Sequence, residues 1–203
     1  MSYRPICDVW ILGRPKVPYY GSFPCGFLQR ARDLLGVHPL DPVLHVCSGM
    51  VRAYGDPANG VVPGRSVAGF GINDRTLDID PECKPDFLQD AREPFPDLPF
   101  IDGQRRGTIV NGETVFHWPA ILIDRPYTEE DATHYRCGSD VFPAMGVLLK
   151  NATEAVRPGG RIGVLDYLFP RPPATLRLVA KISVNHGYNN RDRCYTVFEK
   201  EMP

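Results

Sequence analysis

The sequence predicts an α/β fold: a mostly parallel sheet with helices on both faces, completed by an antiparallel hairpin. Three observations support this prediction. Short, continuously apolar segments recur along the chain, each followed by a polar loop that contains glycine. One intervening segment, 140–156, has apolar residues near helical spacing, and such alternation is typical of a parallel sheet buried on both faces. The last two apolar segments, 175–185 and 194–200, are joined by a short polar loop and should pair antiparallel.

The first predicted helix runs from about Gly26 to Leu35, after an irregular aromatic segment. Its apolar residues share one face, and Gly36 is a favourable end because glycine adopts the left-handed conformation that closes many helices. Strands are then predicted at 43–47, 76–81, 120–124 and 159–168. The helix within 140–156 should end at Arg157-Pro158-Gly159-Gly160, which we interpret as a helix stop followed by a turn.

Two insertions interrupt this order. Residues 56–73 are rich in glycine and proline and are long for a first crossover. Residues 97–118 contain Asn111-Gly112 between two β-prone runs, which is a strong signal for a type I′ hairpin. We therefore expect 97–118 to be a hairpin insertion in a single domain, 1–203.

The composition limits the function classes without selecting one. The 203 residues are 43% hydrophobic and 23% charged, as in ordinary globular domains, and the net charge of -1 gives no global signature for nucleic acid. The six cysteines contain no C-x-x-C pair and the histidines show no ligand spacing, so we expect free thiols and no metal. The sequence has no signal peptide or membrane-spanning run, and we expect a cytoplasmic protein.

Polar residues, most of them acidic, follow the predicted strands, where ligands bind in open α/β sheets. The strand-end groups are Cys47-Ser48-Gly49, Asp78 with Asp80, Asp90, Asp124 to Tyr127, and Asp166-Tyr167. A dinucleotide would favour a G-x-G-x-x-G turn and positive charge, whereas the turn here reads CSGMVRAYG. A cofactor with hydroxyls, an amine and a positive centre fits these acids better, and S-adenosylmethionine has all three.

Five segments in this order resemble the motifs of class I S-adenosylmethionine-dependent methyltransferases. VLHVCSGM resembles the first motif, and TLDIDPECKPDFLQDAREPFP resembles the second and third strands with their acids. AILIDRPY resembles the fourth motif, and VRPGGRIGVLDY the helix, turn and strand after it. The resemblance covers about Pro42 to Leu168. It implies a Rossmann-like, mostly parallel sheet of seven strands and S-adenosylmethionine as the cofactor.

The resemblance also implies cofactor contacts residue by residue. The backbone of Cys47, Ser48 and Gly49 would approach the methionine moiety, Asp78 with Ile79 would hold the ribose, and Asp90 with Ala91 would read the adenine. Residues 1–36 loosely resemble a segment that closes over the cofactor and substrate. This likeness would place Tyr20, Ser22 and Phe23 near the cofactor.

Each of these assignments has a structural alternative. Asp78 could instead cap a helix opened by Pro81, although Asp80 is the better candidate for that cap. Asp90 could be a solvated acid in a turn. The aromatic N-terminal segment could be a plug on the edge of the sheet.

The fourth motif, Asp124-Arg125-Pro126-Tyr127, resembles the D-P-P-Y motif of methyltransferases acting on exocyclic amines of adenine (N6) or cytosine (N4). An aryl amine is a poor nucleophile because its lone pair is delocalised. A carboxylate from Asp124 and the main-chain carbonyl of Arg125 would accept its two N–H groups and favour the pyramidal, attacking form. Pro126 would fix the turn and Tyr127 would stack on the base. Alternatively, Asp124 only caps the helix that follows.

The sequence departs from the family at two places. In the first motif, His45 stands where an acid is frequent, and Met50-Val51 replace the second glycine; we expect His45 to be a packed, satisfied histidine. In the fourth motif, Arg125 replaces a proline. Its charge could keep Asp124 ionised or contact a phosphate or carboxylate of the substrate.

Target recognition has little sequence available to it. Arg105 and Arg106 in the insertion, with Arg191 and Arg193 in the last loop, could form a local basic patch for DNA or RNA phosphates, or be solvated loop residues. Two further functions stay open: a small-molecule or protein methyltransferase, and a non-catalytic binding or regulatory protein that keeps the fold.

Overall fold

The computed structural model describes residues 3–13, 22–51, 69–99, 108–110, 113–134, 142–185 and 192–202. Within these residues, eight strands form the main sheet, and two short ones form a separate hairpin. The main-sheet strands are β1 (Ile6–Ile11), β2 (Val43–Val46), β3 (Arg75–Asp78), β4 (Phe87–Leu88), β7 (Trp118–Ile123), β8 (Val156–Asp166), β9 (Leu176–Asn185) and β10 (Arg193–Lys200). The hairpin consists of β5 (Thr108–Val110) and β6 (Glu113–Val115). The α-helices described are α1 (Phe27–Leu35), α2 (Glu129–His134) and α3 (Met145–Ala155).

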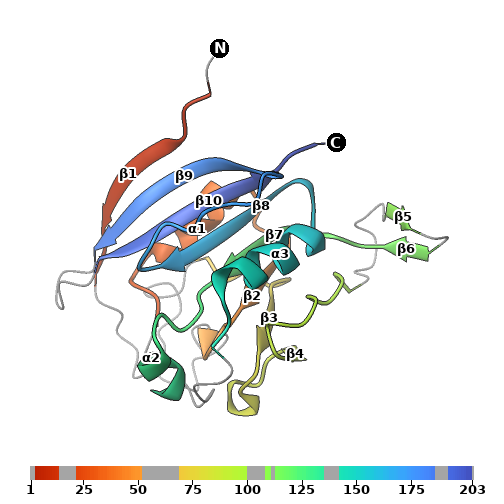
Figure 1. Ribbon diagram of the computed structural model, residues 1–203, viewed down its shortest axis with the longest axis horizontal. Coiled ribbons are helices and arrows are strands. Elements are labelled where there is room, and N and C mark those ends of the chain that lie inside the picture. The colour runs from red at the N-terminus through yellow and green to blue at the C-terminus, as the bar shows by residue number, and fades with distance from the viewer. Residues whose placement is uncertain are drawn as a thin grey trace.

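The main sheet has the order β1-β9-β10-β8-β7-β2-β3-β4 (Figure 1). Every neighbouring pair is parallel except those made by β10, which runs antiparallel to both β8 and β9. The prediction of a mostly parallel sheet with a C-terminal antiparallel hairpin is therefore confirmed. Helix α1 also begins and ends within a residue of its predicted bounds, and Gly36 closes it at a φ of 65°.

The prediction of seven strands is wrong by one, because β1 adds an eighth. Ile6 to Ile11 pairs in parallel with β9, at the edge of the sheet. Its residues are mostly apolar, but only Trp10 of this strand is buried, so its short apolar run does not mark a core strand. Its pairing partner lies at the other end of the chain, where no local signal points to it.

The predicted turn at Arg157 to Gly160 is also wrong, because β8 begins at Val156, immediately after α3. Val156 pairs with Trp118 and Arg161 pairs with Ala120, so the residues between them bulge out opposite one residue of β7. A Cβ on Gly160 would lie 2.8 Å from the Pro119 carbonyl oxygen. Gly160 is therefore needed for the close approach of β7 and β8, and it does not mark a turn between separate elements.

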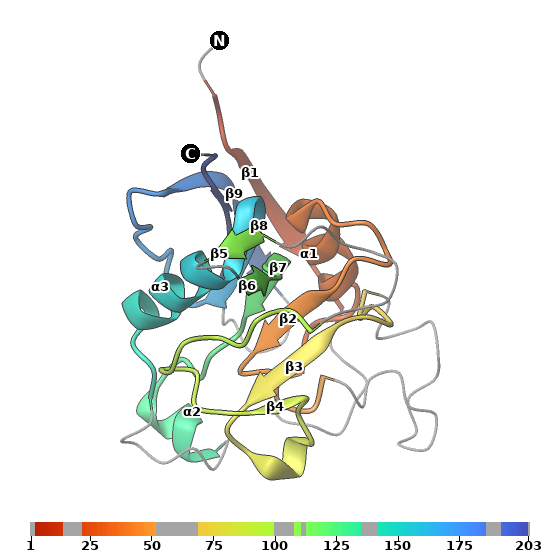
Figure 2. The ribbon, with the colours of Figure 1, turned by 90° about the vertical axis from the view of Figure 1, so that its right-hand side faces the viewer.

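Two apolar clusters cover the sheet. Phe27, Leu28, Ala31 and Leu35 of α1 share one cluster with Ala120 and Leu122 of β7. Leu148, Leu149, Ala152 and Ala155 of α3 share the other with Ile121 and Ile123. Because successive residues of a strand point to opposite faces, the two helices pack on opposite faces of β7. Figure 2 shows α1 and α3 on either side of the strands.

The predicted hairpin insertion is present as β5 and β6. Val110 pairs with Glu113, which leaves a two-residue connection at Asn111-Gly112, as expected; the turn itself lies outside the described residues. The hairpin leads into the first residue of β7, and Asp124 follows the last. Since β7 has six residues of about 3.3 Å each, the base of the hairpin lies roughly 20 Å from the carboxyl end of the strand. Figure 1 shows the hairpin extending from that distant side.

Candidate functional site

The carboxyl ends of β2, β3, β4, β7 and β8 meet along one edge of the sheet because these strands are parallel. The chain passes from β2 to β3 on one side, and later returns to β7 on the other side of β2. This reversal makes the end of β2 the topological switch point, where ligands bind in such sheets. The Asp124 amide donates to the Val46 carbonyl oxygen (3.2 Å), so the first and fourth sequence motifs lie side by side there.

The turn after β2 has an uncommon backbone. Cys47 has a φ of 55° and Gly49 a φ of 50°. The left-handed region favours glycine, so Cys47 is held there at a cost of roughly 1–3 kcal/mol. Apart from its two chain neighbours, no atom of the described residues lies within 4 Å of a Cβ built on Gly49. The Ser48 hydroxyl is buried and has no hydrogen-bond partner among the described residues.

Asp78 ties this turn to the end of β3. Its Oδ2 accepts the Gly49 amide (2.8 Å) and its Oδ1 accepts the Asp80 amide (3.0 Å). Burial raises the pKa of Asp78, and the nearby Asp80 carboxylate adds to the rise, although the amide hydrogen bonds partly offset both. The Ile79 amide is a third backbone donor that acts on this carboxylate, and a carboxylate has roughly four lone-pair positions.

The helix cap predicted near Asp78 belongs to Asp80, as expected. Asp80 accepts the Glu82 amide (2.9 Å) and precedes Pro81, the first residue of a short 3₁₀ helix. This assignment removes the structural alternative for Asp78. The contacts of Asp78 join the ends of β2 and β3. Ile79 lies between Asp78 and Asp80 and is partly exposed.

Asp90 lies in a tight turn after β4. Its carboxylate accepts the Arg92 amide (2.8 Å) and the Arg92 guanidinium (2.6 Å at the closest pair), and these contacts lower the pKa of Asp90. Asn151 of α3 donates to the carbonyl oxygens of Ala91, Arg92 and Glu93, which fixes the turn against α3. The adenine contact implied for Asp90 and Ala91 stays a prediction, and Arg92 already holds the acid.

Asp124 follows β7 and is bound by the aromatic residue of the same motif. The Tyr127 hydroxyl donates to Asp124 Oδ1 at 2.5 Å. Burial raises the pKa of Asp124 to about 6; the Arg193 charge and the Tyr127 hydrogen bond lower it, and the Asp166 charge raises it. The alternative that Asp124 caps the next helix is wrong, because the Thr128 hydroxyl accepts the Asp131 amide (3.0 Å) at the start of α2.

Arg125 is anchored away from Asp124. Its Nε donates to Asp166 Oδ2 (3.0 Å), its Nη1 donates to the Pro143 carbonyl oxygen (2.9 Å), and its guanidinium lies over the Phe142 ring (4.6 Å). These contacts join the end of β7 to the end of β8 and to the segment before α3. The cation that lowers the pKa of Asp124 is Arg193, whereas the sequence suggested Arg125.

Tyr127 has two further neighbours. The Tyr167 ring centre lies 4.4 Å from the Tyr127 ring centre, and the two ring planes make an angle of 39°. The Arg193 guanidinium carbon lies 5.0 Å from the Tyr127 ring centre. The sequence placed Tyr167 at a strand end without a specific role, and it placed Arg193 in a loop as a possible phosphate contact. The strand-end position of Leu165-Asp166-Tyr167 was the available signal for Tyr167, but a contact between two strand ends cannot be predicted from spacing.

The N-terminal segment contributes to the core as far as it is described. Ser22 and Phe23 are buried, and the Phe23 ring stacks on Phe27 of α1 (5.1 Å between centres). Phe23 thus packs as the alternative of an aromatic plug predicts, and its contact with a cofactor stays a prediction. Tyr20, Arg105, Arg106 and Arg191 lie outside the described residues.

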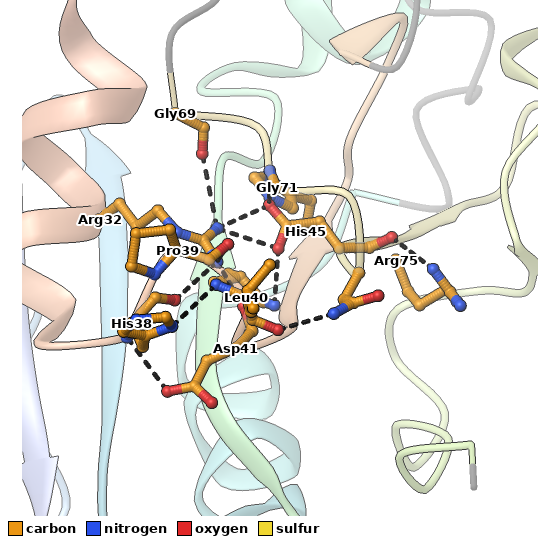
Figure 3. A network of polar contacts seen from close by, with 12 residues as sticks. Arg32, His38, Pro39, Leu40, Asp41, His45, Gly69, Gly71 and Arg75 are labelled. Atoms are coloured by element: carbon orange, nitrogen blue, oxygen red, sulfur yellow. Dashed lines mark hydrogen bonds and ion pairs between the residues drawn. The ribbon is translucent and has the colours of Figure 1, made fainter. Parts of the chain in front are cut away.

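His45 forms part of a buried polar network on the α1 face of the sheet (Figure 3). Its Nε2 is 3.0 Å from Asp74 Oδ2, and Asp74 also accepts the amides of Val43 (2.9 Å) and Gly71 (2.7 Å) and the Arg32 guanidinium (2.9 Å). His45 Nδ1 has no hydrogen-bond partner within the described segments. The expectation of a satisfied histidine therefore holds for Nε2 and not for Nδ1.

Other site classes find no support within the described residues. No group of three or more histidine, cysteine, aspartate or glutamate residues is arranged there to hold a metal ion. Among the described cysteines, Cys7 and Cys194 are free thiols. No helix in the described part of the chain is both long and apolar enough to span a bilayer.

Comparisons with known proteins give a likeness of fold. No protein-family model matches the sequence, and no curated protein matches it. Among solved structures, TrmN from Thermus thermophilus superposes with a TM-score of 0.55 at 18% identity, over 89% of this chain and 50% of that one. The methyltransferase in complex with the Haloferax volcanii Trm112 methyltransferase activator superposes with a TM-score of 0.51 at 13% identity, over 86% and 88%.

The chain thus spans about half the length of TrmN and most of the length of the Haloferax volcanii protein. At these identities the likeness concerns the fold alone. The strand order, the single antiparallel strand and these two superpositions together show that the protein has the α/β Rossmann-like fold of the methyltransferases.

Proposed function

We propose that the protein is an S-adenosylmethionine-dependent methyltransferase that acts on an exocyclic amine of a nucleic-acid base. The observation that carries the proposal is the Asp124–Tyr127 pair at the switch point of a methyltransferase fold. A half-buried carboxylate there, held by a tyrosine hydroxyl beside the turn after β2, is the acceptor that an amine N–H requires.

The residues after β2 and β3 fit the cofactor. The Asp78 carboxylate would accept the ribose hydroxyls beside its backbone donors. Among the described residues, the turn at Cys47 to Gly49 leaves open space where a side chain at residue 49 would lie. Ile79 would pack on the nucleoside. Asp90 with Ala91 would contact the adenine edge once the Arg92 guanidinium releases the Asp90 carboxylate. When bound, S-adenosylmethionine supplies an electrophilic methyl group.

The acceptor residues act through charge and position. With a pKa of about 6, Asp124 is about nine-tenths ionised at pH 7 and therefore mostly an acceptor. It would take one N–H of the amine, and the Arg125 carbonyl would take the other, while Pro126 fixes that carbonyl's direction. The contacts of the Arg125 side chain with Asp166 and Pro143 supply rigidity that a second proline would give in the D-P-P-Y motif.

The proposed partner is DNA or RNA. Arg193 lies beside Tyr127 and could meet a phosphate of the nucleotide, and Arg105, Arg106 and Arg191 stay proposed phosphate contacts. The β5–β6 hairpin is a weaker candidate for base recognition, because its base lies at the opposite end of β7 from Asp124.

A small-molecule acceptor is the second candidate, and a specific observation favours it. The hairpin is the main insertion available for recognising a long target, and within the described residues it lies away from the site. A non-catalytic role is favoured instead by the altered first motif, where His45 stands in place of an acid and Met50-Val51 in place of the second glycine.

Transfer of a tritiated methyl group to separate pools of DNA, RNA and nucleotides tests the proposal. We expect counts in at least one nucleic-acid pool and their loss in Asp124→Asn, with Asp33→Asn, an exposed acid on α1, as the matched control. The rate should rise with pH through about 6, as Asp124 ionises. Counts only in small-molecule pools would favour the second candidate, and full activity in Asp124→Asn would rule out the amine-holding role.

A further inference from the structure

The Arg193 side chain lies where the proposed acceptor should bind. Strand β10 is antiparallel, so its first residues lie at the edge where the parallel strands end, and Cys194 pairs with Asp166. The Arg193 guanidinium carbon is 5.0 Å from the centre of the Tyr127 ring, within the range of a cation–π contact. Its charge also acts on Asp124, which accepts the Tyr127 hydroxyl.

A guanidinium and an aryl amine make the same demands on these two residues. Both are planar, delocalised groups that carry N–H donors and stack on aromatic rings. The ring of Tyr127 offers the stacking surface and the carboxylate of Asp124 offers the acceptor. A base that stacks on Tyr127 beside Asp124 therefore competes for the place that Arg193 now takes.

Tyr167 and Arg193 both contact the Tyr127 ring within the described residues, and Arg193 is the easier of the two to displace. Tyr167 is fixed at the end of β8, where its amide donates to Asp166 Oδ1 (2.6 Å) and its carbonyl oxygen lies 3.5 Å from Cys194 Sγ. Arginine has a long side chain with many rotamers, so its guanidinium can move while its backbone stays paired in β10.

We infer that Arg193 occupies the acceptor subsite in the free protein and leaves it when a flat amine stacks on Tyr127. This inference rests on the proposed function and deepens it. A displaced guanidinium needs a new partner, and a phosphate on the acceptor supplies one. The site therefore discriminates in favour of a phosphate-bearing nucleotide over the same bare base.

Equilibrium binding of two probes, 9-methyladenine and AMP, to the whole protein tests the inference. Arg193→Ala should bind 9-methyladenine roughly 3- to 10-fold more tightly than the wild type, the range expected for removing a cation–π competitor. The same change should reduce the wild-type preference for AMP over 9-methyladenine. Arg177→Ala is the matched control and should leave both affinities unchanged. Arg177 pairs with Glu199 near the start of β9, whereas Arg193 lies beside the end of that strand.

The outcomes separate this inference from the proposed function. Equal or weaker binding of 9-methyladenine by Arg193→Ala would overturn the inference and leave the acceptor assignment standing. If neither the wild type nor the variant binds either probe, the acceptor assignment itself fails, and the inference fails with it. Should Arg193→Ala not fold, Arg193→Met keeps the length of the side chain and removes the charge and the planar donors.

Discussion

Asp124 is suited to accept an N–H, but its ionised carboxylate lowers the free energy of unfolding of the protein. Burial disfavours its ionised form, and the Tyr127 hydrogen bond and the Arg193 charge only partly compensate. The folded-state pKa of about 6 lies above the ordinary value of 3.8, so ionisation opposes folding. This cost is absent below about pH 4 and complete above about pH 6, where it reaches on the order of 3 kcal/mol.

Asp124→Asn should therefore stabilise the protein at high pH. Asparagine keeps an oxygen that can accept the Tyr127 hydroxyl and removes the buried charge. We expect the free energy of unfolding to rise by up to about 3 kcal/mol at pH 8 and to change little at pH 4. Urea unfolding at both pH values measures this; an equal change at the two would show that the charge is not the cause.

Residue-scale predictions from the sequence succeeded where one short segment contains the whole interaction. Asp80 was correctly preferred over Asp78 as the helix cap, because a cap and its helix are consecutive. The partners of Arg125 and of Tyr127 were not predictable, because Asp166, Tyr167 and Arg193 come from other strands. Arg125 was identified as the unusual residue of its motif, but its ion pair with Asp166 depends on how β7 and β8 pair.

At the scale of elements, the Asp74 network fastens α1 to the two strands that build the proposed cofactor site. Arg32 of α1, the Val43 amide and His45 of β2 all contact Asp74, the residue before β3 (Figure 3). Burial alone would raise the pKa of Asp74, but its contacts with His45, Arg32 and the Gly71 amide outweigh burial and lower it. The network thereby helps to set the register in which Asp78 meets Gly49.

Asp74→Ala should destabilise the protein strongly, because it leaves the Arg32 guanidinium and two amides buried without their acceptor. Breaking a buried ion pair in this way costs about 3–5 kcal/mol. Asp33→Ala, on the exposed face of α1, should change the free energy of unfolding by less than about 0.5 kcal/mol. Denaturant unfolding of both variants measures the difference, and similar small effects would mean that the network contributes little.

Elements were predictable in proportion to how local their signals are. Helix α1 and strands β9 and β10 follow from periodicity and turn residues near each other in the chain. Strand β1 and the start of β8 were not predicted correctly, because both depend on pairing with distant segments. The same glycines that indicate a turn also permit the bulge in β8, and only the neighbouring strand distinguishes the two.

For the whole molecule, the sheet joins two apolar clusters and places the proposed site at one edge. Trp10 connects the edge strand β1 to the cluster on the α1 face through Phe27 and Tyr195. The order of the motifs predicted which edge carries the site. It could not predict that β10 would bring Arg193 there, or that the β5–β6 hairpin would begin at the opposite end of β7.

The edge strand should matter to the whole fold through Trp10 alone. Trp10→Ala removes a large buried side chain and should lower the free energy of unfolding by about 3–5 kcal/mol. Val9→Ala, at a neighbouring position that is 61% exposed, should change it by less than about 0.5 kcal/mol. Thermal unfolding of the two variants compares the buried and the exposed face of β1. Equal losses of stability in the two would mean that β1 is held by its backbone pairing instead.

Calorimetric titration with S-adenosylmethionine tests the central claim most directly. We expect saturable binding by the wild type and at least about a tenfold loss in Asp78→Ala, since a buried acceptor of two ribose hydroxyls is removed. Asp80→Ala, which removes the cap of the adjacent 3₁₀ helix and leaves the Asp78 carboxylate in place, should still bind. Absence of binding by the wild type, or identical affinities for the wild type and Asp78→Ala, would contradict the account.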